Sequence, residues 1–267
     1  MSPQSLPQPP HRLPLARGIA AAFVVLGTLG ALSACGAGDG DGKSDGKAGA
    51  PASAPRAANG SEAGRAAPTS LPHELPGIGP RTLAQLPDRA RQVLLVTGAG
   101  RDSSRSKAVL YERADNGDWR PGPSWPAHNA HRGWTDKHLQ GDLRSPIGVF
   151  GLTDAGGLDE DPGSKLPYER SRAFTATGSG IEGEPLAGSF DYVVAINYNR
   201  VPGTSPLDWT RPLGAERGGG IWVHVDHGGA TQGCVSIAKH HMRDLLRRLD
   251  PARHPVIVMG DTKSLAR

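Results

Sequence analysis

Aromatic residues are scarce in this sequence, at 5% of its 267 positions, whereas glycine and proline are abundant, at 37 and 24 residues. Much of the glycine and proline lies before residue 90. Such a stretch has few side chains that can fill a core, so we expect the folded part to be one domain of roughly 170–180 residues. A domain of that length can bury a substantial hydrophobic core.

Dense runs of lysine or arginine are missing from the part expected to fold, although the net charge of the chain is +4. Without a basic stripe, the sequence lacks the electrostatic signature of a nucleic-acid-binding protein. The ten histidines include no HxxxH or His-x-His pair beside a carboxylate at metal-ligand spacing. We therefore expect neither nucleic-acid binding nor a zinc site.

The apolar stretch near the N-terminus is too short to cross a bilayer. It covers residues 18–31, whereas a membrane-spanning helix needs about 20 residues. Arg12 and Arg17 precede it, and small residues lie toward its end. This arrangement is typical of a secretory signal.

Cysteine occurs only twice, at Cys35 and Cys234, and two cysteines in an exported chain first suggest a disulfide. The segment Leu32-Ser33-Ala34-Cys35, however, resembles the bacterial lipobox. That resemblance implies cleavage before Cys35 and a diacylglycerol on its thiol, which anchors the chain to the membrane through acyl chains. The alternative is an ordinary signal peptide, or a membrane anchor, with a chance cysteine. In the lipoprotein interpretation, Cys234 is the only free thiol.

Residues 36–70 consist mostly of glycine, alanine, serine, proline and charged residues. They can bury too little apolar surface to offset the entropy of ordering the chain, so we expect a disordered tether. We place a signal peptide at 1–34, a lipid-anchored flexible linker at 35–87 with one short helical turn near 81–86, and the folded domain at 88–264. The mature protein is then expected in the cell envelope, outside the cytoplasm.

The folded part is expected to be mainly β, as a sandwich or barrel with one or two short helices. One segment has the periodicity of an amphipathic helix, because Met242, Leu245, Leu246 and Leu249 repeat at helical spacing within residues 238–249. Short β-rich runs bounded by glycine, proline and aspartate predict strands with long connections. These runs are residues 92–97, 107–113, 190–197, 220–225 and 255–259.

Cys234 has the surroundings that a nucleophilic cysteine needs. Gly233 precedes it and permits a tight turn, and a helix is expected just after it, whose N-terminal amides favour an anion. Those amides, or the N–H of Cys234, could hold an oxyanion. His224 and His227 lie 10 and 7 residues upstream, within reach as a base. The alternatives are a small buried cysteine, a core histidine and a loop histidine.

Two segments resemble the L,D-transpeptidase (YkuD-type) family. Thr231-Gln232-Gly233-Cys234-Val235-Ser236 matches the family's active-site signature at Thr, Gly and Cys, after a histidine on a strand. Ser145-Pro146-Ile147-Gly148-Val149-Phe150 is similar to the family's Thr-Pro-x-Gly-x-Phe/Tyr element, with serine in place of threonine. The resemblance extends over residues 90–262 of the chain.

This resemblance implies a cysteine acyltransferase that forms 3→3 cross-links between peptidoglycan stem peptides and serves cell-wall organisation and cell shape. It implies Cys234 as the nucleophile, His224 as the general base and the Gly233 backbone as part of the oxyanion site. We expect no cofactor, and a monomer whose partners are stem peptides and, through the lipid, the membrane. The expected substrate-binding residues are Thr231, Gln232, Ser236, His227 and Tyr198.

Three features depart from the usual pattern of that family. Gln232 stands where a histidine usually precedes Gly-Cys, and Ser236 stands where arginine or asparagine is usual. The spacing of 10 residues from His224 to Cys234 is also shorter than usual. The alternatives are His227 as the base, an L,D-carboxypeptidase that uses water as the acceptor, and a non-catalytic wall-binding lipoprotein on the same fold.

Overall fold

The computed structural model of the protein describes residues 74–267. The expected signal peptide, the lipidation site Cys35 and most of the expected linker lie outside the described residues. Within residues 74–267, no helix is both long enough and apolar enough to cross a membrane.

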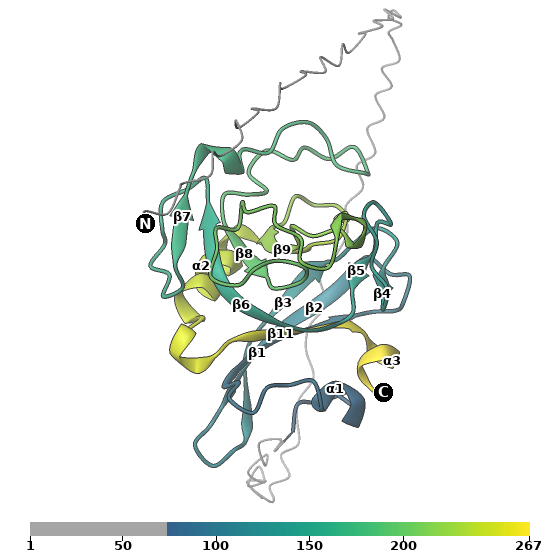
Figure 1. Cartoon of the computed structure of the whole chain (residues 1–267), viewed down its shortest axis with the longest axis vertical. Helices are drawn as coiled ribbons and strands as arrows, with labels where there is room; N and C mark the ends of the chain where they lie inside the picture. Colours follow the sequence, from purple (N-terminus) through teal and green to yellow (C-terminus); the bar gives the residue numbers. More distant parts are fainter. Residues whose placement is uncertain (1–73) are drawn as a thin grey trace, which may run out of the picture. The chain divides into compact units, whose positions relative to one another are not determined.

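The fold is mainly β, as predicted, and its centre is a closed barrel of eight strands (Figure 1). The order around the barrel is β11-β1-β2-β3-β10-β9-β8-β6, and antiparallel pairing of β6 with β11 closes it. β7 adds to β6 outside this ring, and β4 and β5 form a separate parallel pair. The strands are β1 Gln92–Gly98, β2 Arg105–Arg113, β3 Trp119–His128, β4 Trp134–Thr135, β5 Ser145–Pro146, β6 Gly148–Gly157, β7 Tyr168–Arg170, β8 Val193–Ile196, β9 Trp222–Val225, β10 Val235–Ile237 and β11 Val256–Asp261.

Helices are few and short in the described part of the chain. The longest, α2 at Lys239–Arg248, confirms the helix expected at residues 238–249, and Met242, Leu245 and Leu246 form its buried face. The other α-helices are α1 Pro80–Leu83 and α3 Thr262–Leu265, and the 3-10 helices are η1 Arg172–Phe174, η2 Ala215–Arg217 and η3 Pro251–Arg253.

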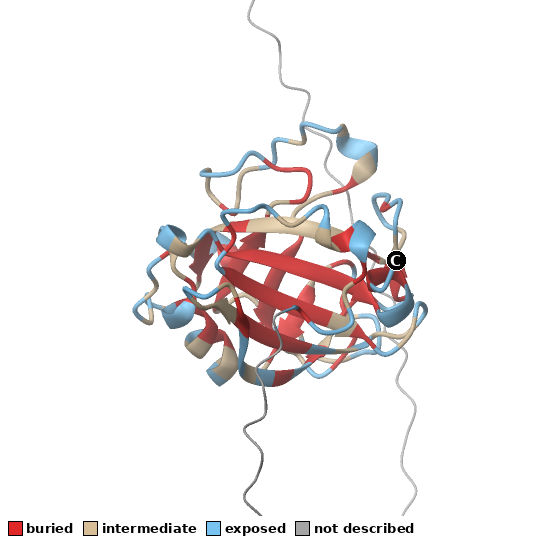
Figure 2. Cartoon of the chain, turned by 90° about the horizontal axis from the view of Figure 1, so that it is seen from below, coloured by how far each residue is buried: buried red, intermediate tan, exposed pale blue. Residues whose placement is uncertain are grey.

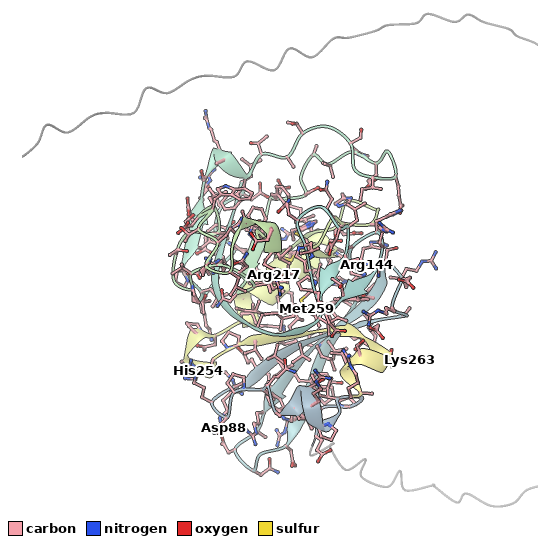
Figure 3. The ribbon with its side chains drawn as sticks, turned by 45° about the vertical axis from the view of Figure 1, so that its right-hand side comes forward. Asp88, Arg144, Arg217, His254, Met259 and Lys263 are labelled. Atoms are coloured by element: carbon pink, nitrogen blue, oxygen red, sulfur yellow. The ribbon has the colours of Figure 1, made fainter. Side chains whose placement is uncertain are left out.

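Strands β1, β8, β9, β10 and β11 are buried along almost their whole length, whereas β3 exposes half of its residues (Figure 2). Alternate residues of each strand point to opposite faces, so one strand contributes to two apolar clusters. Val223 and Val225 of β9 pack with α2 in the largest cluster, whereas Trp222 belongs to a smaller cluster on the opposite face. Met259 of β11 lies amid the packed side chains, and Lys263 lies at the periphery (Figure 3).

The packed structure begins before residue 88, the expected start of the domain. Leu75 is only 2% exposed and joins an apolar cluster with residues of β1, β2, β11 and α3. The N–H groups of Gly79 and Arg81 donate to the carbonyls of Leu265 and Arg267, at 2.9 Å each. Residues 75–87 therefore form a layer over one side of the barrel, docked on the C-terminal segment.

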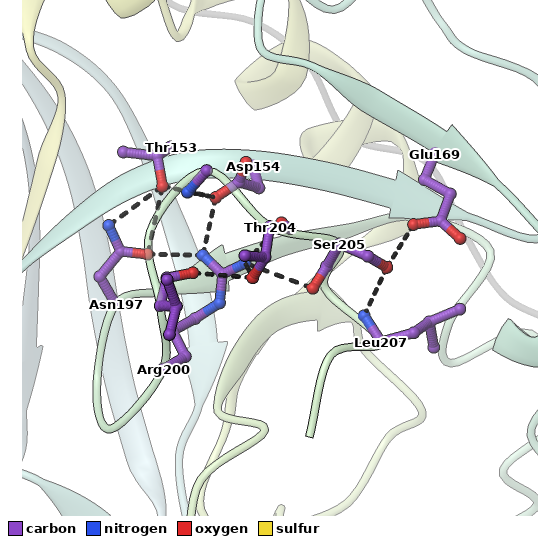
Figure 4. A network of polar contacts seen from close by, with 10 residues as sticks. Thr153, Asp154, Glu169, Asn197, Arg200, Thr204, Ser205 and Leu207 are labelled. Atoms are coloured by element: carbon purple, nitrogen blue, oxygen red, sulfur yellow. Dashed lines mark hydrogen bonds and ion pairs between the residues drawn. The ribbon is translucent and has the colours of Figure 1, made fainter. Parts of the chain in front are cut away.

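The long connection after β8 is held by a buried ion pair (Figure 4). The register of β6 against β8 shifts between Leu152 and Ala155, so Asp154 lies at a bulge. Arg200 donates to the Asp154 carboxylate at 2.7 Å, and both side chains are at most 5% exposed. Arg200 also donates to Asn197 Oδ1 and to the Thr204 carbonyl. This network fixes the start of the segment that leads to β9.

Candidate active site

His224 lies on β9, and Cys234 directly precedes β10, the parallel neighbour of β9. In the register of β9 and β10, Val223 lies opposite Val235 and His224 lies opposite Ser236. Because side chains alternate along a strand, Trp222 and His224 point to the same face of β9. The same register places Cys234 opposite Trp222, so the Cys234 side chain points to that face as well. Two residues along a strand correspond to about 6–7 Å, a separation that the side chains of Cys234 and His224 can span.

The two side chains line one cavity of about 240 Å³. His227, Thr231 and Gln232 line it as well, and they come from the nine-residue connection, residues 226–234, that runs back from the end of β9 to the start of β10. The opposite wall comes from the connection before β8, with Ile181, Leu186 and Phe190 among its residues. The structure therefore brings five of the predicted site residues together: Cys234, His224, His227, Thr231 and Gln232.

His224 is buried and held in one orientation. Its Nδ1 lies 2.9 Å from the Val225 carbonyl, and the backbone of Ser189 also hydrogen-bonds to the ring. Since the Val225 carbonyl only accepts, Nδ1 carries the proton and Nε2 is the unprotonated nitrogen of the neutral ring. Phe190 packs edge-on against the ring, with centroids 5.3 Å apart. Burial lowers the pKa of His224 to about 4, and the hydrogen bond to Val225 opposes this shift only in part. The ring is neutral at pH 7.

The Cys234 thiol is also uncharged at rest. Burial raises its pKa to about 11, although the Trp222 N–H, 3.4 Å from Sγ, opposes the shift by favouring a thiolate. The sulfur lies 3.8 Å from the Gly220 carbonyl, which can accept the S–H. The pair is therefore a neutral thiol and a neutral imidazole at pH 7.

Both motifs that resemble the L,D-transpeptidase family meet at the carbonyl of Cys234. Thr231 Oγ1 donates to this carbonyl at 2.7 Å, and Ser145 Oγ of β5 donates to it at 3.3 Å. Ser145 Oγ also accepts the Ala130 N–H at 3.0 Å. The hydroxyl of Thr231, expected to bind substrate, thus holds the backbone next to the nucleophile, while the residue itself still lines the cavity.

Two expected substrate-binding residues point elsewhere. Ser236 is fully buried, and its hydroxyl donates to Asp226 Oδ1, which also pairs with His128 at 2.8 Å. Tyr198 is buried in the main core, and its hydroxyl donates to the Arg217 carbonyl at 2.9 Å. Neither residue lines the cavity, so both support the fold around the site.

The helix expected directly after Cys234 begins later. Residues Val235–Ile237 form β10, because they pair with β9, and α2 begins only at Lys239. The N-terminal amides of α2 are therefore not adjacent to the thiol. The N–H groups of Gly233 and Cys234 remain as the candidate oxyanion donors.

Sequence reasoning missed Glu184, which lies beside His227. Its Oε1 lies 3.0 Å from Nδ1 of His227, and the two side chains are 12% and 5% exposed. Glu184 lies 40 or more residues before His224, His227 and Cys234 along the chain, in a glycine-rich segment that looks like an ordinary loop. Only the folded barrel places it beside the cavity.

An exposed aromatic residue lies on the other side of the thiol. Trp209 is 72% exposed, and the guanidinium of Arg211 lies 4.7 Å from the centroid of its ring. A Cβ at Gly219 would meet Arg211, and a Cβ at Gly220 would approach both Arg211 and Trp209. Gly220 is the residue whose carbonyl lies 3.8 Å from the Cys234 sulfur.

Comparisons with known proteins do not identify a family for this chain. No protein-family model matches the chain, and no curated protein matches it. Two solved structures of the helical cell shape determining protein Pgp2 from Campylobacter jejuni, one of them a point mutant, are similar at 16% identity with TM-scores of 0.35 and 0.36. The similarity covers 65% of this chain but only 47–48% of those chains. Scores of this size support no inference about this chain.

Proposed function

We propose that this protein is a cysteine acyltransferase of the L,D-transpeptidase type that acts on peptidoglycan stem peptides. The observation that carries the proposal is the joint placement of Cys234 and His224 in one cavity, with Nδ1 of His224 held against the Val225 carbonyl. The choice of substrate rests on the two sequence motifs, which share the Cys234 carbonyl. The carboxypeptidase and the non-catalytic wall-binding protein are the alternatives.

In the first step, Nε2 of His224 takes the thiol proton while Sγ of Cys234 attacks a carbonyl carbon of the stem peptide. The attacked carbonyl belongs to diaminopimelate, and the N–H groups of Gly233 and Cys234 stabilise its oxyanion. The C–N bond to the terminal D-alanine then breaks. The departing amine takes the proton from His224, which leaves a thioester on Cys234 and a neutral imidazole.

In the second step, the side-chain amine of a neighbouring stem attacks the thioester. As the C–N bond forms, the amine loses a proton to Nε2 of His224, and as the C–S bond breaks, His224 passes that proton to the sulfur. The product is a 3→3 cross-link. If water attacks instead, the product is a tripeptide stem, and the same residues perform a carboxypeptidase reaction.

The test is to incubate the full chain, in detergent, with a disaccharide-tetrapeptide and to identify the products by mass spectrometry. We expect dimers with a 3→3 link from the native protein and none from Cys234→Ala. For His224→Gln, we expect a loss of acylation rate of about 10²–10⁴-fold, because a general base typically contributes that much. Circular dichroism of each variant controls for folding.

Each alternative predicts a different result in this test. Tripeptide monomer without dimer would assign the protein as a carboxypeptidase. Intact substrate from the native protein, together with no carbapenem adduct on Cys234 and wall binding that survives Cys234→Ala, would identify a non-catalytic wall-binding protein.

We further propose that a lipid on Cys35 anchors the enzyme to the membrane. The support is the lipobox-like segment before Cys35. The experiment compares the native chain with Cys35→Ser by membrane fractionation and by mass spectrometry of the mature N-terminus. A diacylglyceryl mass on Cys35 and its loss in the variant are expected; an unmodified Cys35 in the membrane fraction would contradict the anchor.

A further inference from the structure

A second histidine with a carboxylate partner faces the cavity that holds the thiol. His227 lines the cavity, and its Nδ1 lies 3.0 Å from Glu184 Oε1. Both side chains are largely buried, at 5% and 12% exposed. The mechanism proposed above uses neither residue. Burial of a carboxylate is costly, so its placement beside His227 calls for an explanation.

The backbone around Glu184 is shaped to admit its carboxylate. At Gly180 and at Gly229, a Cβ atom would overlap the Glu184 carboxylate. The Glu182 N–H donates to the second carboxylate oxygen at 2.9 Å, and the Gly180 N–H donates to the Glu184 carbonyl at 2.7 Å. Two glycines from different connections thus leave room for one charged group, which the fold holds against His227.

The two imidazoles of the site differ in what they face. They stack with centroids 5.7 Å apart and planes 10° from parallel. Nδ1 of His224 faces a neutral carbonyl, whereas Nδ1 of His227 faces a carboxylate. An adjacent negative charge stabilises a protonated ring more than a carbonyl dipole does. His227 is therefore the ring beside which a cationic acceptor meets a carboxylate, whereas His224 faces only backbone dipoles.

We propose that the Glu184–His227 pair receives the acyl acceptor and selects a primary ammonium over water. This inference rests on the proposed acyl transfer, and it names the acceptor class of that same site. An ammonium has no free lone pair and is not a nucleophile until it loses a proton, whereas neutral water already has a lone pair that can attack. A negative carboxylate beside a proton acceptor favours the cation and then takes its proton.

The proton balance of the step is as follows in the acylated site. Nε2 of His227 takes one proton from the R–NH₃⁺ acceptor, and Glu184 stabilises the resulting imidazolium. The neutral amine attacks the thioester carbon, and its second proton passes to His224 as the C–S bond breaks. His224 returns that proton to the Cys234 sulfur, and His227 releases its own proton to solvent. The products are an amide, a thiol and two neutral histidines.

The experiment separates acylation from the fate of the acyl-enzyme in the full chain. Formation of the Cys234 adduct from a tetrapeptide donor alone is followed by rapid-quench mass spectrometry. The adduct is then offered a stem peptide with a free side-chain amine, and the ratio of cross-linked to hydrolysed product is measured. The variants are Glu184→Gln and His227→Gln. The matched control is Glu182→Gln, which removes the same charge from the same connection, where Glu182 is 51% exposed and lies 3.7 Å from His131.

We expect Glu184→Gln and His227→Gln to form the adduct within about threefold of the native rate. The ratio of cross-linked to hydrolysed product should fall by about 100-fold, the low end of what a general base contributes. Glu182→Gln should change neither quantity. Raising the pH should restore the ratio in Glu184→Gln, because bulk solvent then deprotonates the amine; a purely structural role would not give this rescue.

Several results would overturn the inference. An unchanged ratio in both variants, or an equal loss of acylation and cross-linking, would show that the pair does not select the acceptor. A native acyl-enzyme that only hydrolyses would also refute it, while leaving the acylation chemistry intact. If the native protein forms no adduct, the proposed function itself is wrong and this inference fails with it. If Glu184→Gln unfolds, His227→Gln decides the matter alone.

Discussion

At the scale of single residues, burial sets the charge state of the site. It raises the pKa of the Cys234 thiol to about 11 and lowers that of His224 to about 4. A thiolate–imidazolium pair at neutral pH would need the opposite order, with the thiol the stronger acid. The neutral thiol is therefore a weak nucleophile toward adventitious electrophiles, and the proposed reaction requires its deprotonation as substrate binds.

This charge state predicts how Cys234 reacts with a simple electrophile. Only the thiolate reacts, so below the thiol pKa the rate should rise about tenfold per pH unit. We expect iodoacetamide to alkylate Cys234 ever faster from pH 6 toward about pH 10, with no plateau near neutrality. The measurement is the pH–rate profile by mass spectrometry in a Cys35→Ser chain, which leaves one thiol. A plateau between pH 6 and 8 would instead reveal a preformed ion pair.

A second prediction at this scale concerns the hydroxyl of Ser145. Ser145→Ala removes a donor from the Cys234 carbonyl and leaves the buried Ala130 N–H without its acceptor. An unsatisfied buried group costs about 1–3 kcal/mol, so urea denaturation should show a loss of that size, and acylation of Cys234 should slow. Ser145→Thr keeps the hydroxyl and is the control. Equal stability of the alanine and threonine variants would show that this hydroxyl does not hold the nucleophile.

At the scale of elements, the ion pair between Asp154 and Arg200 ties the bulge of β6 to the connection after β8. Either single variant, Asp154→Asn or Arg200→Met, leaves one buried charge without its partner. We expect a loss of about 3–5 kcal/mol for each. The double variant should lose much less than the sum, because it leaves no unpaired charge. Urea denaturation of all three variants measures this coupling.

The matched control for this prediction is an ion pair at the surface. Arg170 and Glu160 lie 3.1 Å apart, but their side chains are 60% and 82% exposed. Glu160→Gln should therefore cost less than about 1 kcal/mol. If Glu160→Gln lowers the free energy of unfolding as much as Asp154→Asn does, burial is not the reason for the large contribution of the Asp154–Arg200 pair.

The sequence predicted those elements whose patterns are local. Strands with runs of β-branched and aliphatic residues, such as β1 and β11, and the periodic helix α2 were all expected near their observed positions. β3 was missed, because Pro121, Pro123 and Pro126 argue against a strand. The structure explains them: β3 pairs along its length with β2 but meets β10 only at His128, so most of one edge needs no N–H donors.

The site was predictable only in part, for a similar reason. Cys234 and His224 sit in one local motif, and both line the cavity as expected. Ser236 and Tyr198 do not line this cavity, because strand pairing and core packing direct their hydroxyls to Asp226 and to the Arg217 carbonyl. Glu184 had no local signal at all. Its position depends on a tertiary contact that two glycines make possible, Gly180 nearby and Gly229 in another connection.

At the scale of the whole molecule, residues 75–87 are part of the folded domain, because they cover an apolar cluster on one side of the barrel. Leu75 fills an apolar cluster with Val93, Val258 and Leu265, and Ile78 and Leu86 pack against the same cluster. Backbone hydrogen bonds from Gly79 and Arg81 join this layer to the last residues of the chain. The first and last segments of the described chain thus pack on each other and stabilise each other.

This dependence predicts that a domain cut at the boundary expected from the sequence is unstable. A chain of residues 88–267 lacks Leu75 and its neighbours, and removing one buried leucine alone costs about 2–5 kcal/mol. We expect its free energy of unfolding to be lower than that of residues 74–267 by at least this amount, so that it unfolds at a lower urea concentration. Gly79→Ala in the longer chain should reproduce part of the loss, because a Cβ there would overlap the Ala266 carbonyl and lift the layer away. Identical midpoints for the two lengths would mean that the layer covers the barrel without stabilising it, and that the expected boundary at residue 88 describes the folding unit after all.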